Sequence, residues 1–229
     1  MISIVALSLA LICAVCDGKT FYVGLSGPWK GFFAMGSHGA GALPVALDVI
    51  RHDNITFHEI NRGGHEFKYA WTDTECNPSV GISKVADLLY GRGPLRKPID
   101  VLFGPGCSRV CESVGYLAKG TNTPVISYSC FSNLLSDKSI YPTFARTTGP
   151  SKFYSPAFVS IVKILNYTRV AIFAGSESFY DSMTNVIIQD LTSHGILVTD
   201  FTTLPGFSSG DRSNSIEDLS IIRERCKGK

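Results

Sequence analysis

The chain has 229 residues, of which 45% are hydrophobic and 17% are charged. This composition and a mean hydropathy of +0.16 are typical of a folded globular protein and exclude a disordered chain. A formal net charge of +2, without a long run of lysine or arginine, argues against a nucleic-acid partner. The length is enough for one large domain or two small ones.

An apolar segment at the N-terminus indicates a secretory signal peptide. Residues 2–15 are all apolar or small, and Ala14 and Cys16 place small side chains at the usual cleavage offsets. The apolar core of a signal peptide runs about 7–15 residues, whereas a membrane-spanning helix needs about 20. We therefore expect residues 1–18 to be removed and the mature chain to be exported. Any membrane attachment is expected only through further C-terminal parts.

The cysteine pattern also favours an oxidising compartment. Two of the seven cysteines fall in the expected signal peptide, and the others are Cys76, Cys107, Cys111, Cys130 and Cys226. Two intrachain disulfides and one free thiol are the simplest expectation for this number. The spacing does not match a zinc site, so we expect no metal. Acceptor sequences for N-glycosylation at Asn54 and Asn166 agree with export.

Strand-like and helix-like patterns alternate along the rest of the chain. Strands are expected at 21–25, 66–71, 99–103, 124–128, 143–147, 169–174 and 196–201. Helices are expected at 43–50, 110–120, 179–191 and 216–225. Two further helices are expected to begin with Asn77 and Ser155 as their N-caps. Pro44 should lie in the first turn of its helix, and Gly120 should end another. Such alternation predicts an α/β fold with parallel sheets.

The final third of the chain predicts an unfinished second unit. An apolar helix face is expected from Tyr154, Phe158, Ile161, Val162 and Leu165. Only about two strands follow this helix, which is fewer than a closed sheet core needs. We therefore expect an incomplete second lobe.

The most informative segment is the apolar run 99–103, which breaks onto Gly104-Pro-Gly-Cys107 just before a helical pattern. A strand that ends in such a turn directs backbone N–H groups to the edge of the sheet where α/β proteins bind ligands. Arg109 replaces the third glycine of a dinucleotide fingerprint. The pattern therefore favours a structural turn, with room for an anion at the helix N-terminus, over a nucleotide site.

No catalytic constellation stands out in the chain. Pro28 occupies the position where a nucleophile elbow requires glycine. Asp73 and Glu75 are better placed to cap a helix than to bind a cation, which needs many convergent oxygens. A hydrolase or an oxidoreductase is therefore only a remote alternative.

Polar and aromatic side chains instead gather at the expected strand ends, which parallel sheets bring to one rim. These ends are 26–29, 71–74, 104–108, 127–129 and 175–178. They carry Trp29, Trp71 and Tyr128, with Tyr180 close by, and hydroxyls that include Ser127 and Ser176. Binding sites favour this mixture, although core packing explains each aromatic residue equally well. We expect a ligand-binding crevice here.

Three segments resemble one known family. Ile99–Cys107, Pro124–Cys130 and Leu135–Pro150 are similar to the ligand-binding region of natriuretic-peptide receptors and other receptor guanylate cyclases, especially invertebrate ones. The resemblance runs from about residue 20 to 226, which is about half of such an ectodomain. It implies a type I periplasmic-binding-protein-like fold with two Rossmann-like lobes of parallel sheet flanked by helices. The membrane-distal lobe would be 19–147, and a partial second lobe would be 148–229.

The resemblance also implies specific bonds and sites. It implies a disulfide between Cys76 and Cys107. By elimination, we then expect Cys111 and Cys130 to form the second pair and Cys226 to be free. It implies a chloride site at the backbone of Gly106 and Cys107. The serine that the family carries seven residues before the first bridging cysteine is replaced by Tyr69.

The hormone-contacting positions depart from the family pattern. Asn77 and Pro78 stand where natriuretic-peptide receptors carry an acid, and Arg109 and Tyr116 stand where they carry an aromatic residue and an arginine. The resemblance therefore implies that the ligand is a peptide other than a natriuretic peptide, or that the chain has retained no ligand.

We expect a secreted or ectodomain ligand-binding module without catalytic activity of its own, which can form a homodimer. Ligand would bias a rearrangement of lobes or protomers. The candidate ligand-binding residues are Trp29, Trp71, Ser127, Tyr128, Ser176, Arg109 and Tyr116. The alternatives are an amino-acid-type small-molecule sensor, with ligand near Trp71 and Ser127, and a soluble decoy. A truncated receptor is expected over a decoy, because an unfinished lobe exposes apolar surface.

Overall fold

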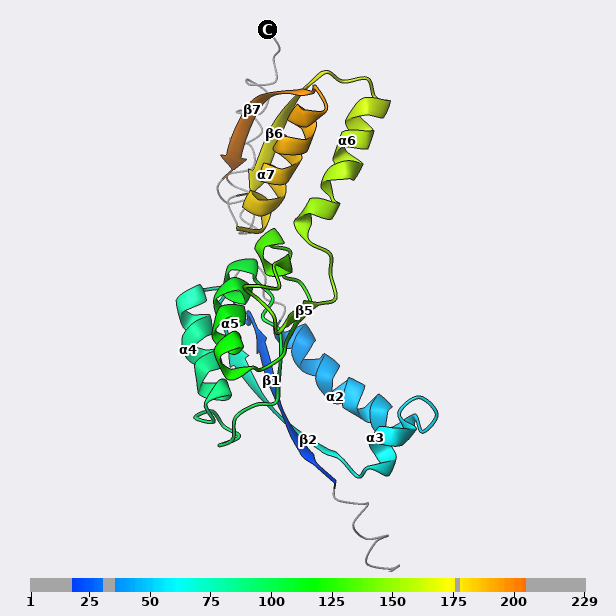
Figure 1. The fold of residues 1–229 in the computed structure, drawn as a ribbon, viewed down its shortest axis with the longest axis vertical. Coiled ribbons are helices and arrows are strands. Elements are labelled where there is room, and N and C mark those ends of the chain that lie inside the picture. Colours follow the sequence, from blue (N-terminus) through cyan, green and yellow to red (C-terminus); the bar gives the residue numbers. More distant parts are fainter. Residues whose placement is uncertain (1–17, 31–35, 176–177, 205–229) are drawn as a thin grey trace, which may run out of the picture.

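The computed structural model describes residues 18–30, 36–175 and 178–204 (Figure 1). The strands are β1 (Thr20–Gly27), β2 (Glu66–Asp73), β3 (Val101–Phe103), β4 (Val125–Ser127), β5 (Phe144–Arg146), β6 (Arg169–Gly175) and β7 (Leu197–Leu204). The helices are α2 (Gly36–His52), α3 (His58–Arg62), α4 (Pro78–Leu89), α5 (Ser108–Thr121), α6 (Ser155–Ile164) and α7 (Ser178–Ser193), with short 3-10 turns η1 (Asn133–Ser136) and η2 (Ser151–Phe153). Residues 1–17 of the expected signal peptide, Ser176, Cys226 and the expected helix at 216–225 lie outside the described residues.

The larger sheet has five parallel strands in the order β2-β1-β3-β4-β5. In Figure 1, α4 and α5 lie side by side on one face of this sheet, and α2 lies across the other face. The chain moves outward from β1 to β2 and then returns to β3 on the other side of β1. This reversal places a topological switch point between the carboxyl ends of β1 and β3, which is where open α/β sheets bind ligands.

The main core lies between this sheet and the two helices α4 and α5. Val85 and Leu88 of α4, Leu102 of β3, and Val110 and Val114 of α5 are at most 3% exposed. The helical spacing of these apolar residues turns one side of each helix to the sheet. Burial of each such side chain contributes roughly 1.5–3 kcal/mol.

The start of α4 follows directly from local sequence. The Asn77 side chain accepts hydrogen bonds from the backbone N–H groups of Ser79 and Val80 at 2.9 and 3.3 Å. Pro78 occupies the first helical position, where its missing N–H costs nothing. The predicted cap is therefore confirmed, and it fixes the segment that follows β2.

The second sheet contains β6 and β7, which pair in parallel. Figure 1 shows α6 and α7 next to each other beside this sheet. A smaller core forms there from Val159, Ile187, Leu191 and Ile196. In both sheets the strands pair in parallel. This confirms the prediction of an α/β fold with parallel sheets.

Three predicted helix ends are wrong. Pro44 lies inside α2, because the helix already begins at Gly36. Gly120 lies within α5, and Asn122 ends it in the left-handed conformation with φ of 53°. Asparagine adopts this conformation more readily than most residues, so it can replace glycine at a helix end. Ser155 is the first residue of α6 rather than its cap, which is Tyr154.

The predicted apolar face of α6 does not pack as expected in the described part of the chain. Tyr154, Phe158, Ile161 and Leu165 are 43–55% exposed. Val162 alone of the predicted set packs against the smaller core. Because α6 is apolar on several sides, periodicity could not identify which side is buried.

Candidate functional site

The candidate site lies at the carboxyl edge of the larger sheet, where two tryptophans from the ends of β1 and β2 meet. The rings of Trp29, just after β1, and Trp71, in β2, lie 5.8 Å apart at 82°. Both side chains are partly buried. Edge-to-face pairs of this kind are worth about 0.5–1.5 kcal/mol beyond their burial. The rim therefore has a rigid aromatic wall with exposed surface.

Asp73 fixes this wall in place. One carboxylate oxygen accepts hydrogen bonds from the backbone N–H groups of Trp29 at 3.0 Å and Glu75 at 2.9 Å. Asn77 caps α4, so the expectation that Asp73 and Glu75 act as caps is wrong. The carboxylate instead joins the loops that follow β1 and β2.

The turn after β3 approaches the backbone of β1 too closely for any side chain. Gly104 has φ of 99°, and a Cβ atom there would lie 1.8 Å from the carbonyl oxygen of Ser26. Its N–H donates to the carbonyl of Ile126 at 2.9 Å, which connects the turn to β4. Glycine is therefore required by both the dihedral angle and the close approach.

Gly106 lies against the phenol of Tyr128. A Cβ atom at Gly106 would lie 2.8 Å from the Tyr128 hydroxyl oxygen. The Ser129 hydroxyl donates to the Gly106 carbonyl at 2.7 Å. Burial raises the pKa of Tyr128 above its ordinary value, so its hydroxyl remains a donor under neutral conditions.

Ser127 is fully buried, and its hydroxyl bonds within the chain. The hydroxyl donates to the carbonyl of Pro105 at 2.8 Å and accepts from the N–H of Cys130 at 3.1 Å. The structure thus places this predicted ligand-binding residue beneath the rim, where it joins the turn after β3 to the end of β4.

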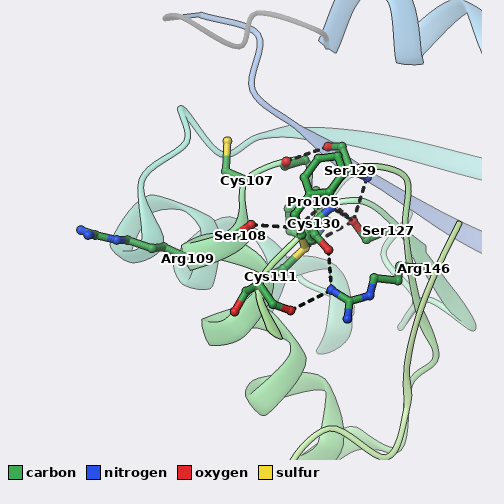
Figure 2. Close-up of a disulfide and its surroundings, with 12 residues drawn as sticks. Pro105, Cys107, Ser108, Arg109, Cys111, Ser127, Ser129, Cys130 and Arg146 are labelled. Carbon is green, nitrogen blue, oxygen red and sulfur yellow. Dashed lines mark hydrogen bonds between the residues drawn. A yellow bond between two sulfur atoms is a disulfide. The ribbon is translucent and has the colours of Figure 1, made fainter. Parts of the chain in front are cut away.

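Two disulfides hold the first turn of α5. Cys76 is bonded to Cys107 with a Cα–Cα distance of 5.5 Å, and Cys111 is bonded to Cys130 with a distance of 6.4 Å. The first pair is the one that the family resemblance implies, and the second is the one expected by elimination. Cys107 immediately precedes α5 and Cys111 lies one turn later, so the helix start is joined to the loops after β2 and β4 (Figure 2).

Arg146 supports the same loop and was not singled out from the sequence. Its guanidinium donates to the carbonyl oxygens of Cys130 and Ser132, both at 2.8 Å (Figure 2). It also donates to the hydroxyl of Ser136 at 2.5 Å. Burial lowers the pKa of Arg146 below its ordinary value. A cation within the short apolar strand β5 is the sequence signal that could have identified it.

The remaining predicted residues do not meet at this rim. Figure 2 shows Arg109 pointing away from the disulfide and Ser127, and Tyr116, two turns further along α5, is 65% exposed. Tyr180 lies by the second sheet, where it lines an apolar pocket of about 510 Å³ with Ile172 and Met183. The structure therefore brings together Trp29 with Trp71 and Tyr128 with Gly106, but not the whole predicted set.

Both predicted glycosylation sites are accessible. Asn54 is exposed in the turn before α3, and Asn166 is exposed just after α6 with φ of 55°. The side-chain amide of Asn61 donates to the Asn54 side-chain oxygen at 2.8 Å, which orients that acceptor.

The residues near the turn suit a small anion. Gly106 and Cys107 lead directly into α5, whose first N–H groups favour negative charge. The buried Ser26 hydroxyl, next to this turn, has no hydrogen-bond partner within the described ranges. Tyr69, at the position of the family's serine, packs against the Trp71 ring at 5.6 Å. An anion would therefore rely on backbone donors and not on that serine.

Residues 18–30, 36–175 and 178–204 contain neither a metal-binding cluster nor a membrane-spanning helix. No group of three or more His, Cys, Asp or Glu side chains there could hold a metal ion. None of the helices in these ranges has both the length and the apolar character for crossing a bilayer.

Comparison with known proteins identifies the family. A family model described as "Receptor family ligand binding region" matches residues 39–227. The chain is 32% identical over 177 residues to the speract receptor of Strongylocentrotus purpuratus, which covers 74% of the chain and 14% of that receptor. It is 25% identical over 185 residues to gamma-aminobutyric acid type B receptor subunit 1 of Mus musculus, covering 80% of the chain and 18% of that subunit.

A further relative carries the name of a guanylyl cyclase. Retinal guanylyl cyclase 2 of Rattus norvegicus is 24% identical over 222 residues, covering 94% of the chain and 18% of the cyclase. The chain therefore spans less than a fifth of each of these relatives.

Solved structures with the same fold include a solute-binding protein of an ABC transporter from R. palustris, in complex with 4-hydroxybenzoate. The match has a TM-score of 0.67 and 16% identity, and it covers 88% of this chain and 51% of that protein. The likeness confirms the predicted type I periplasmic-binding-protein-like fold. The chain belongs to the receptor family ligand binding region and is related to receptor guanylate cyclases.

Proposed function

We propose that this chain is the extracellular ligand-binding region of a receptor of the guanylate cyclase type, and that its ligand is a peptide. The observation that carries the proposal is the family match over residues 39–227, together with the aromatic rim at the carboxyl ends of β1 and β2. The two disulfides and the exposed acceptor asparagines support an extracellular location. The peptide class rests on the resemblance to natriuretic-peptide receptors.

In this proposal, residues 19–147 form the membrane-distal lobe and residues 148–229 contribute to the second. A ligand that contacts the rim more favourably in one arrangement of lobes or protomers shifts the population towards that arrangement. Arg109 and Tyr116 are exposed on α5 and would contact a peptide or a second copy of the chain. No step of this mechanism requires catalysis.

A small anion such as chloride is part of the proposal. The backbone N–H groups at Gly106 and Cys107, with the buried Ser26 hydroxyl nearby, would hold it. Its contribution is structural, because a negative charge at the N-terminus of α5 stabilises the helix that both disulfides hold.

A second candidate function is a sensor of amino-acid-type small molecules. The 25% identity to a gamma-aminobutyric acid receptor subunit favours it, because that relative is named for a small molecule. The paired rings of Trp29 and Trp71 are also suited to contact with a compact ligand.

Intrinsic fluorescence tests the proposal, because both tryptophans of the chain lie at this rim. The purified chain is titrated with speract, resact, gamma-aminobutyric acid and benzoate. We expect a saturable change with a peptide, which the Trp71→Phe variant weakens at least fivefold. Tyr167→Phe, an exposed tyrosine near the second sheet, is the matched control.

The outcomes separate the two candidates. Saturation by gamma-aminobutyric acid alone favours the small-molecule sensor. Binding that is equal in wild type and Trp71→Phe would contradict a site at this rim.

A further inference from the structure

The two disulfides differ in their contact with solvent. Cys111 and Cys130 are both fully buried, and their sulfurs lie 3.3 Å from the Pro105 carbonyl oxygen. Cys107 is 6% exposed, whereas its partner Cys76 is an exposed residue in the loop between β2 and α4. Figure 2 shows the Cys107 sulfur pointing away from the buried pair. Of these two bridges, Cys76–Cys107 is therefore the one with an end that a dissolved thiol can reach.

The backbone at Cys76 is held in a conformation that its side chain disfavours. Glu75 and Cys76 have φ values of 51° and 54°, in the left-handed region that few residues other than glycine and asparagine adopt. The Glu75 N–H donates to the Asp73 carboxylate at 2.9 Å, and the bridge to Cys107 adds a covalent restraint. Cleavage of the bridge would let the two disfavoured residues relax, which favours the open form.

Cys107 is placed to leave as a thiolate. It is the N-cap of α5, a helix of 14 residues, and its side chain makes no capping hydrogen bond in the disulfide form. A helix N-terminus favours negative charge, and its first N–H groups donate to a side-chain acceptor at the N-cap. A sulfur released from the bridge would carry its charge at this position. Exchange that attacks Cys76 and releases Cys107 is therefore the favoured direction.

We propose that Cys76 is a site of covalent modification by thiols, through exchange of its disulfide with Cys107. The sulfur of an external thiolate, such as that of glutathione, attacks the Cys76 Sγ atom and forms a new S–S bond with it. The Cys76–Cys107 bond breaks, and its electron pair leaves with the Cys107 Sγ atom as a thiolate. The proton of the added thiol passes to water before the attack. One disulfide is lost and one is formed, so the step needs no oxidant.

The modification affects the aromatic rim through Asp73. The carboxylate oxygen that accepts from Glu75, the neighbour of Cys76, also accepts from the Trp29 N–H at 3.0 Å. The Trp29 ring in turn packs against Trp71. Relaxation of the loop at Glu75 would remove a hydrogen bond from the carboxylate that positions Trp29. We therefore expect a changed environment of the tryptophan pair in the modified chain.

Mass spectrometry of the purified full chain tests the proposal. The folded chain is incubated with excess reduced glutathione without denaturant, the reaction is quenched in acid, and free thiols are alkylated. We expect glutathione on Cys76 and the alkyl group on Cys107, at a rate at least tenfold higher than any opening of Cys111–Cys130. Glutathione mainly on Cys107, equal opening of both bridges, or no reaction in the folded chain would overturn the proposal.

Two variants at Glu75 test the contribution of the backbone. Glu75→Asn and Glu75→Gln both remove the charge beside Cys76, but asparagine tolerates the left-handed conformation better. Glu75→Asn should therefore stabilise the closed bridge. In the same glutathione buffer we expect its ratio of open to closed bridge to be at least threefold lower than that of Glu75→Gln. Equal ratios would overturn the contribution of the disfavoured backbone.

Tryptophan emission without ligand tests the effect on the rim. We expect the emission to shift in the chain modified at Cys76, and to return when glutathione is removed and the Cys107 thiolate closes the bridge again. Unchanged emission in the fully modified chain would overturn the link to the rim. Because no ligand enters these measurements, their failure would leave the proposed receptor function standing, and that function is tested by its own titration.

Discussion

The buried hydroxyl of Ser127 donates a hydrogen bond to the carbonyl oxygen of Pro105 at 2.8 Å. This contact joins the end of β4 to the turn after β3, the two segments that support Tyr128 and Gly106. The same carbonyl lies 3.3 Å from the sulfurs of both Cys111 and Cys130. One buried oxygen is therefore the point where the turn, the strand and a disulfide meet.

Replacement of Ser127 by alanine should destabilise the chain without abolishing its fold. The Pro105 carbonyl and the Cys130 N–H lose a buried partner, which costs about 1–3 kcal/mol. Denaturant unfolding of Ser127→Ala measures this loss. Ser160→Ala is the control, because Ser160 is exposed and its hydroxyl donates to the Pro156 carbonyl within its own helix. We expect a change within about 0.5 kcal/mol for the control. Equal effects of the two variants would contradict the supporting role of Ser127.

The two glycines of the turn should respond differently to alanine. At Gly106 the new methyl group meets the Tyr128 hydroxyl, and we expect a loss of about 1–3 kcal/mol. Tyr128→Phe should restore part of it by removing the closest atom. At Gly104 the methyl group meets the backbone of Ser26, which cannot move away as a side chain can. Gly104→Ala should therefore be the more destabilising, and Tyr128→Phe should not rescue it. Rescue of both variants, measured by thermal unfolding, would contradict this assignment.

Loss of either disulfide should lower stability by a similar amount. The bridges close segments of 31 and 19 residues. The chain-entropy model gives roughly 3.7 kcal/mol for the longer segment and roughly 3.2 kcal/mol for the shorter. Paired Cys→Ala variants and denaturant unfolding measure these values. Because Cys111 and Cys130 are fully buried, that pair should lose a further amount from the cavity left behind. A stability unchanged in either double variant would contradict the pairing.

Alkaline stability should depend on Tyr128. Burial raises the pKa of its phenol in the folded chain, so the unfolded chain ionises first as the pH rises. Between the unfolded and folded pKa values the folded state holds more protons, and stability falls with rising pH. Tyr128→Phe should remove that part of the fall. Tyr141, whose pKa burial also raises, should still contribute in this variant. Identical pH profiles for wild type and Tyr128→Phe, obtained by denaturant unfolding, would show that Tyr128 is not responsible.

The alternation of strands and helices was predictable because each crossover in the first sheet carries strong local signals. Asn77-Pro78 marks a helix start, and the apolar run before Gly104 marks a buried strand. The helix ends were less predictable, since Asn122 and Gly120 both satisfy the rules for a helix C-terminus and only the fold selects between them. The exposed face of α6 could not be predicted, because its apolar residues occur on more than one side.

The candidate site was predictable in its location but not in the role of each residue. Parallel topology places strand ends at one edge, and this rule predicted that Trp29 and Trp71 would be close. Whether a hydroxyl at that edge faces a ligand or the chain depends on tertiary packing, which directs Ser127 to Pro105. The support from Arg146 comes from carbonyl oxygens that are distant in sequence, and no local pattern indicates them.

Hydrogen exchange of the full chain tests the central claim most directly, with the ligand that gives the largest fluorescence change in the titration. We predict slower exchange of the backbone at 71–74 and 104–108 in the bound state. Exchange in the second strand of the smaller sheet, β7, should change less. Protection confined to β7 or to α7, with the rim of the larger sheet unaffected, would contradict a ligand site at the carboxyl edge of that sheet.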